Sequence, residues 1–315
     1  MKSIIKSLVT ALLLVIGVAA SAAQDIQIYT TDNSEGKITG ESIEKAFVDT
    51  GFFISGRNDM NIAFKSKFKA VNHDLYHLFT VYKKDLVLEL AKITPDAALI
   101  SPLSMSIYMK KGSKDISISS LTIDGMAKIT GISAENKDMV KYAKLLKDAL
   151  AKALPNGHFE KTSYKVLKPM GALVTRFTTE MDEEATTEDA IEEELEGLQE
   201  EIESSLESWG FVMAGFNKLG DDFSEAGYDK YDFFDAYSIC KLPVIFEVSK
   251  KYPEAGAFAP CTFYMYKEKG SSTISMAYPS VYNWISSLDI DDKPSIKVLE
   301  DAQKRMVDTI NEITE

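Results

Sequence analysis

The chain has few of the residues on which many functional sites depend. Its 315 residues include two cysteines, three histidines and two tryptophans. Two cysteines allow at most one internal bridge, which excludes a small scaffold held together by disulfides. The sequence also lacks a nucleophile elbow, a phosphate loop, a dinucleotide-binding fingerprint and a zinc-protease motif. No cofactor is predicted, although scattered catalytic residues would leave no such motif.

Positive charge is also scarce, with 35 lysines and arginines against 48 acidic residues and a formal net charge of −13. A field of this sign repels phosphate backbones and anionic membrane surfaces, so neither nucleic acid nor such a membrane is an expected partner. The hydrophobic fraction of 45% is ordinary for a globular protein and is sufficient for real cores.

Long apolar runs are confined to the N-terminus. A short basic start precedes the apolar run from Leu8 to Val18, and small residues fill positions 19–23. This order is typical of a secretory signal peptide over residues 1–23, with cleavage after Ala22 or Ala23. The alternative is an uncleaved anchor, which needs about 20 apolar residues. We therefore expect a soluble mature chain in the periplasm or outside the cell, with no membrane span after cleavage.

The rest of the chain repeats itself. Residues 42–64 match residues 201–223 at a constant offset of 159, so that Gly51 meets Gly210. Matched blocks in the same order indicate a duplication, and a unit of this length is a tandem domain rather than a solenoid repeat. The later matched blocks are Tyr76, Phe79 and Tyr82 with Tyr231, Phe234 and Tyr237, then 94–102 with 252–260, 105–112 with 263–270, and 116–118 with 274–276.

Each unit has the pattern of one strand, one helix, four strands and one helix. In the second copy, Ile191, Leu195, Leu198 and Ile202 recur at helical spacing, whereas residues 76–83 alternate as a half-buried strand does. This order predicts an α+β fold, in which a mostly antiparallel sheet in each copy has helices packed on one face. The predicted boundaries are a first module over 24–154, a linker and the start of the second copy over 155–170, and a second module over 171–315.

Two segments of the second copy resemble the DUF302 family, a domain of unknown function. They are Cys240-Lys-Leu-Pro243, one residue longer than the family's turn, and the Gly256-to-Cys261 segment with its Pro-Cys end. The resemblance implies a small TBP-like α+β fold that often pairs into dimers. It therefore implies an intramolecular pseudo-dimer of two modules. The first copy lacks both cysteines, and Leu103 stands where Cys261 stands.

The pair Cys240 and Cys261 has three interpretations. The two residues form a disulfide, which needs Cα atoms within about 7 Å; or they are small buried hydrophobes; or they form a reactive or metal-binding pair, which needs an electropositive surrounding. Lys241 is the one adjacent cation, and the separation of 21 residues excludes a CxxC redox motif. A thiol- or metal-dependent activity centred on this pair is the alternative function.

His73 and His77 are weak candidates for metal ligands. Their spacing of four residues would place both rings on one face of a helix. His77 is instead expected to begin a strand, where four residues span about 13 Å, too far for one ion. His158 lies in the linker.

The acidic tract from Glu180 to Glu207 holds fourteen carboxylates, and its apolar positions keep helical phase. The simplest interpretation is the solvated face of a helix over 187–209, and the alternative is a docking surface for a basic partner. The tract lacks the spaced oxygens and glycine of a calcium loop.

Aromatic residues are dense in the second copy, and most are expected to be core. A sheet under a long helix can also enclose an apolar ligand. The candidate pocket residues are Tyr237, Pro243, Phe258, Pro260 and Tyr264. The favoured function is a non-enzymatic binding or interaction protein for a small apolar ligand or a protein partner. A catalytic cleft between the modules is a third hypothesis.

Overall fold

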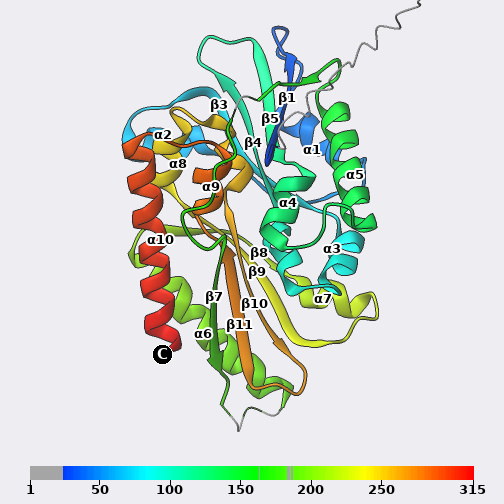
Figure 1. Cartoon of the computed structure of the whole chain (residues 1–315), viewed down its shortest axis with the longest axis vertical. Coiled ribbons are helices and arrows are strands. Elements are labelled where there is room, and N and C mark those ends of the chain that lie inside the picture. The colour runs from blue at the N-terminus through cyan, green and yellow to red at the C-terminus, as the bar shows by residue number, and fades with distance from the viewer. Residues whose placement is uncertain (1–23, 163, 183–184, 186) are drawn as a thin grey trace, which may run out of the picture.

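The computed structural model describes residues 24–162, 164–182, 185 and 187–315. The signal peptide expected over 1–23 lies outside the described residues. Two sheets, in which every strand pair is antiparallel, lie one above the other along the long axis, with helices α5 and α10 on opposite sides (Figure 1). None of the helices in this described part is long and apolar enough to cross a membrane.

The first module forms a sheet in the order β2-β3-β4-β5-β1-β6. Helices α1 and α5 cover one face of this sheet, where Phe47 of α1 packs edge-on against Phe79 of β3 at 5.2 Å between ring centroids. The elements are β1 (Ile26–Asp32), α1 (Gly40–Val48), β2 (Phe53–Asp59), α2 (Met60–Phe68), β3 (His73–Tyr82), α3 (Lys84–Ala91), the 3-10 helix η1 (Pro95–Ile100), β4 (Leu103–Lys110), β5 (Asp115–Leu121), α4 (Ile123–Thr130), α5 (Lys137–Ala153) and β6 (His158–Phe159).

The second module repeats this topology in a sheet of order β7-β11-β10-β9-β8, under helices α6 and α10. The α+β fold class with two tandem modules is therefore confirmed. The elements are β7 (Val174–Glu180), α6 (Glu188–Ser208), β8 (Phe211–Lys218), α7 (Leu219–Glu225), β9 (Tyr231–Lys241), α8 (Leu242–Ser249), η2 (Pro253–Phe258), β10 (Cys261–Glu268), β11 (Thr273–Pro279), α9 (Tyr282–Ser287) and α10 (Lys293–Thr314).

The linker adds a strand to the first sheet. Within 155–170, the segment predicted to join the modules, residues His158 and Phe159 form β6 and pair with Thr30 and Tyr29 of β1. The Tyr29 hydroxyl also donates to the Gly157 carbonyl at 2.9 Å.

The sheet registers correct one part of the sequence alignment. Tyr82 pairs with Phe53 in the first module, and Cys240 pairs with Val212 in the second. Each pair is followed by a β-bulge, between Ile54 and Gly56 in β2 and between Met213 and Gly215 in β8. Tyr82 therefore corresponds to Cys240 and not to Tyr237. The alignment of Tyr76, Phe79 and Tyr82 was wrong by three residues, because the strand β9 has an aromatic side chain at nearly every second or third position.

Each module packs its 3-10 segment against the sheet of the other module. Segment η2 packs on β4 and β5 of the first sheet, on the face opposite α1 and α5. That face is lined by small serines: Ser106 Oγ donates to the Pro253 carbonyl at 2.8 Å, and Ser119 Oγ donates to the Glu254 carbonyl at 2.9 Å. Small side chains let the two backbones approach, and Gly256 of η2 lies directly over Ser106.

The reciprocal contact is similar but more polar. Segment η1 packs on β10 and β11 of the second sheet. Asp96 of η1 accepts a hydrogen bond from the Tyr264 hydroxyl at 2.7 Å and from Arg176 Nη1 at 2.8 Å. Because Tyr264 occupies the register position that Ser106 has in the first sheet, this side is held by a buried carboxylate and not by close backbone contact.

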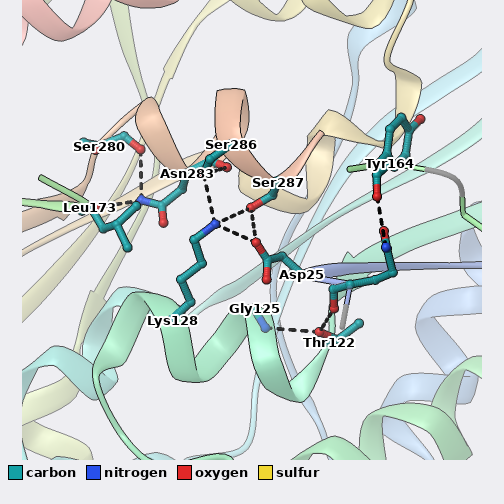
Figure 2. A network of polar contacts seen from close by, with 11 residues as sticks. Asp25, Thr122, Gly125, Lys128, Tyr164, Leu173, Ser280, Asn283, Ser286 and Ser287 are labelled. Carbon is teal, nitrogen blue, oxygen red and sulfur yellow. Dashed lines mark hydrogen bonds and ion pairs between the residues drawn. The ribbon is translucent and has the colours of Figure 1, made fainter. Parts of the chain in front are cut away.

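A second polar contact joins the modules near the first described residues, at Asp25 (Figure 2). Lys128 of α4 donates to Asp25 Oδ2 at 2.6 Å, to Ser286 Oγ at 2.9 Å and to Ser287 Oγ at 3.1 Å. Ser287 in turn donates to Asp25 Oδ2 at 2.6 Å. Asp25 and Ser287 are both at least nine-tenths buried. This clamp therefore fixes the first described residues against helix α9 of the second module.

Candidate functional site

The two cysteines lie at adjacent strand ends in the second module. Both are free thiols, with Cys240 at the end of β9 and Cys261 at the start of β10. They line an apolar cavity of about 50 Å³ between the sheet and helices α8 and α10, where Trp284 and Met306 are also neighbours. For comparison, a cavity that holds benzene has about 150 Å³. This cavity is therefore too small for an organic ligand.

Burial makes these thiols poor nucleophiles. It raises the pKa of Cys240 to about 12, and the neighbouring Cys261 thiol raises this pKa further. Burial likewise raises the pKa of Cys261 to about 12. Lys241, the adjacent cation, lies over the Phe211 ring at 4.6 Å instead of facing a thiol. A thiolate is the reactive form of cysteine, so the geometry fits small buried side chains and not a thiol site.

The rate of alkylation measures the reactivity of the two thiols directly. At pH 8 a thiol with a pKa of about 12 is ionised in roughly one molecule in ten thousand. We expect iodoacetamide to label native protein at least about 100-fold more slowly than protein in guanidinium, with no reductant needed. The Cys240→Ser and Cys261→Ser variants assign each rate. Native labelling at the denatured rate would contradict this account, as would thiols that appear in guanidinium only after reduction.

The five residues predicted to line a pocket lie on different elements of the second module. Phe258 and Pro260 line an interface cavity of only about 20 Å³, too small for a substrate. Tyr264 binds Asp96, and Tyr237 packs against Phe216 at 4.8 Å between centroids. Pro243 lies in the first turn of α8. These side chains fill the cores and the module interface, and the small interface cavity gives the inter-module catalytic cleft no support.

The two histidines lie on β3 and face different partners. His73 Nε2 is 2.7 Å from the Ser249 carbonyl of the second module, and His77 Nδ1 is 3.4 Å from Arg57 Nη1. Burial lowers the pKa of both rings. His73 therefore has a place in the module interface, and His77 has one beside the charged pair of Arg57 and Glu44.

A larger cavity, which the sequence did not predict, lies between helix α6, helix α7 and the second sheet. Its volume is about 410 Å³, within the range of about 300–1,000 Å³ that is usual for small-molecule sites. We call it the α6 cavity. It is lined by Glu188, Ile191, Glu192, Leu195, Lys218, Gly220, Asp221, Ser224, Asp229, Tyr231, Asp232, Phe233, Phe234, Asp235 and Lys269.

The α6 cavity depends on a helical extension that the first module does not have. Helix α6 has 21 residues, whereas its counterpart α1 has 9. The alignment places Gly40, the first residue of α1, opposite Gln199, so residues 188–198 have no equivalent. All four residues that α6 contributes to the cavity lie within 188–198. The extension therefore forms one wall of a cavity specific to the second module.

Local sequence explains both walls. Thr187 caps the N-terminus of helix α6, since its side chain accepts a hydrogen bond from the Ala190 amide. Ile191 and Leu195 form the apolar face of the helix, which packs toward the sheet. On the opposite wall, a Cβ on Gly220 of α7 would come within 2.9 Å of the Phe234 amide nitrogen. Glycine at this position therefore allows α7 to lie directly against β9.

Asp235 is the buried charge of the cavity. It lies on β9 between Lys218 of β8 and Met265 of β10, and only 3% of its surface is exposed. Burial raises its pKa to about 6, against the opposing effects of a hydrogen bond from Gln199 and the charge of Lys218. Gln199 donates to Oδ2 at 2.8 Å, and Oδ1 accepts no hydrogen bond from any residue that the structure describes. Asp235 thus has one oxygen available to a ligand.

The sequence contained a partial signal for this site. Asp235 is an acid within the aromatic strand that begins at Tyr231, and the acidic helix is longer than its counterpart in the first copy. The helix itself was predicted over 187–209 and is observed over Glu188–Ser208. What the pattern could not show is that the extension stands away from the sheet and leaves space beneath it.

No protein-family model matches the chain, and no curated protein matches it. Among solved structures, it is similar to an uncharacterized conserved DUF302 protein from Bacillus stearothermophilus, with 18% identity and a TM-score of 0.34. That match covers 44% of this chain and 98% of the other.

Proposed function

We propose that this protein is an exported binding protein with no catalysis of its own, built from two DUF302-like modules, and that it holds a small ligand in the α6 cavity. The single observation behind this proposal is a cavity of about 410 Å³ whose wall is a helical extension found only in the second module. The first module and the exchanged η segments act as the scaffold that fixes the second sheet.

Support for the DUF302-like modules comes from the chain itself. Both copies share one strand order and one bulge position, and the second contains the Gly256-to-Cys261 segment that resembles the family.

Export is proposed from the N-terminal pattern of a basic start, an apolar run and small residues. We expect the chain produced in a Gram-negative host to be released with the periplasm and to begin at Ala23 or Gln24, as N-terminal sequencing would show. The Leu13→Arg variant interrupts the apolar run and is expected to stay uncleaved in the cytoplasm. A wild-type chain that remains full-length in the cytoplasm would contradict export.

Ligand binding is testable without knowing the ligand. Ser224 of α7 lines the cavity and is exposed, so Ser224→Trp should fill space with little effect on folding. In a thermal-shift screen of small metabolites, we expect compounds that raise the Tm of the wild-type protein and fail to raise that of Ser224→Trp. A screen without any binder, or binders that act equally on both proteins, would refute the proposed site.

A further inference from the structure

We infer that the α6 cavity binds an organic cation, a primary ammonium group on an apolar body, with Asp235 as its anionic anchor. The inference rests on the proposed function, because it requires that this cavity is a ligand site. It adds the chemical class of the ligand, which follows from the charge, the apolar lining and the hydrogen-bonding state of the cavity.

The lining of the α6 cavity has an excess of negative charge. Six carboxylates and two lysines line the cavity. Two of these acids already have cationic partners: Asp229 binds Lys269 at 2.5 Å, and Asp232 binds Lys267. The remaining four acids form no ion pair with any described residue, and Lys218 is the one further cation of the lining. These four acids are Glu188, Glu192, Asp221 and Asp235.

An excess of negative charge in a partly enclosed site favours a cationic ligand, because low-dielectric walls strengthen its attraction. The excess is also spread over three elements, since Glu188 and Glu192 lie on α6, Asp221 on α7 and Asp235 on β9. Among the described residues, no group of three acids, histidines or cysteines is close enough to hold one metal ion. This spacing fits an extended cation better than a coordinated metal.

Part of the lining of the α6 cavity is apolar. Ile191 and Leu195 of α6 face Phe233 of β9, which lies on the same face of this strand as Asp235. Aliphatic and aromatic walls bury a hydrocarbon body, and aromatic faces also attract ammonium groups. A fully hydrated inorganic cation gains nothing from such walls. An amine with an alkyl or aryl body matches both halves of the lining.

Asp235 is buried in the wall of the α6 cavity. An almost fully buried carboxylate with a hydrogen bond to one oxygen alone is unfavourable unless something else approaches the other. An ammonium donor at Oδ1 would supply a charge-assisted hydrogen bond and neutralise the buried charge. Burial has raised the pKa of Asp235 to about 6, so the carboxylate is ionised at neutral pH and can form that pair.

The test is calorimetric titration of the full mature chain at pH 7.5 with three probes of one shape: hexylamine, hexan-1-ol and hexanoate. We expect hexylamine to bind at least about tenfold more tightly than the alcohol, and hexanoate not to bind. Asp235→Asn keeps the side-chain volume and should weaken hexylamine binding by at least about tenfold. Glu196→Gln, on the exposed side of the same helix and outside the cavity lining, should leave the affinity unchanged.

Two further results make the test decisive. Glu192→Gln removes an exposed charge that cannot affect the core, and it should weaken hexylamine binding by about two- to threefold. Equal affinity for hexylamine and hexan-1-ol, or full affinity in Asp235→Asn, would overturn the inference. If the alcohol binds and Ser224→Trp abolishes its binding, the cavity remains a ligand site and the cationic class is wrong. If no probe and no screened metabolite binds, both proposals fail.

Discussion

Gly256→Ala is expected to lower the free energy of unfolding by about 2–4 kcal/mol. A Cβ at this position would lie 2.4 Å from Ser106 Cβ and 3.0 Å from Ser106 Cα. The second of these atoms is backbone, so η2 or strand β4 must move. That movement also strains the hydrogen bond from Ser106 to the Pro253 carbonyl. Urea unfolding followed by far-UV circular dichroism measures the change.

Gly197→Ala is the matched control for this substitution. Gly197 lies within the exposed face of α6, and a Cβ there would meet nothing within 4 Å. Alanine stabilises a helix interior by up to about 1 kcal/mol relative to glycine. The two glycine-to-alanine changes should therefore have opposite signs. If Gly256→Ala is as harmless as Gly197→Ala, η2 does not pack on the first sheet as described.

Asp235→Asn is expected to raise the free energy of unfolding by about 1–3 kcal/mol at pH 8 and to have little effect at pH 4. The pKa of Asp235 is raised from 3.8 to about 6 in the folded chain, so the folded state binds this proton more tightly than the unfolded state. Stability from this group is present below pH 4 and is lost as the pH rises through 6. Asparagine does not titrate and avoids that loss.

The measurement is urea unfolding of both proteins at pH 4, 6 and 8, with Glu196→Gln as the surface control. The control should shift stability by less than about 0.5 kcal/mol at each pH. Lys218 and Asp221 act on Asp235 in opposite directions and are present in every variant. A variant that is less stable than wild type at pH 8 would show that Asp235 is satisfied within the fold and needs no ligand.

These two expectations for Asp235 reinforce one another. The same substitution should stabilise the empty protein and remove amine binding, which is the relation expected of a residue placed for a ligand at a cost in stability. A purely structural carboxylate would show neither effect.

The duplicated α+β modules could be predicted from the sequence because gapped blocks such as 42–64 and 201–223 preserve helix ends and strand alternation. The register of β9 could not, since its dense aromatic residues allow an alignment three positions away. Strand pairing resolves this, because it places Tyr82 and Cys240 at equivalent positions.

The module interface could not be predicted because its residues have the alternating pattern of a strand with one solvent-exposed face. Ser104, Ser106, Ser117 and Ser119 alternate with large apolar residues and would ordinarily point to water. In the structure all four are buried. Ser104, Ser106 and Ser119 donate to carbonyls of the segment 253–260, whereas Ser117 pairs with Thr30 of β1. Only the tertiary contact with η2 distinguishes a buried serine face from an exposed one.

The α6 cavity could not be predicted from the local sequence pattern either. The acidic tract was interpreted as a solvated helix face, and most of its carboxylates are exposed. The cavity arises because the extension over 188–198 encloses space against β9 and α7, which is a property of relative helix length and not of local pattern. A comparison of α6 with α1 is what identifies it.

The most direct test of the central claim, a cation site formed by the second module's extended helix, is the amide chemical-shift map of the isotope-labelled mature chain during titration with hexylamine. The account predicts saturable shifts at Leu195, Gln199, Gly220 and Asp235, with the η2 interface around Ser106 and the cysteine cavity around Cys261 unchanged. Shifts centred on the module interface or on Cys261, or no saturable shift at all, would contradict it.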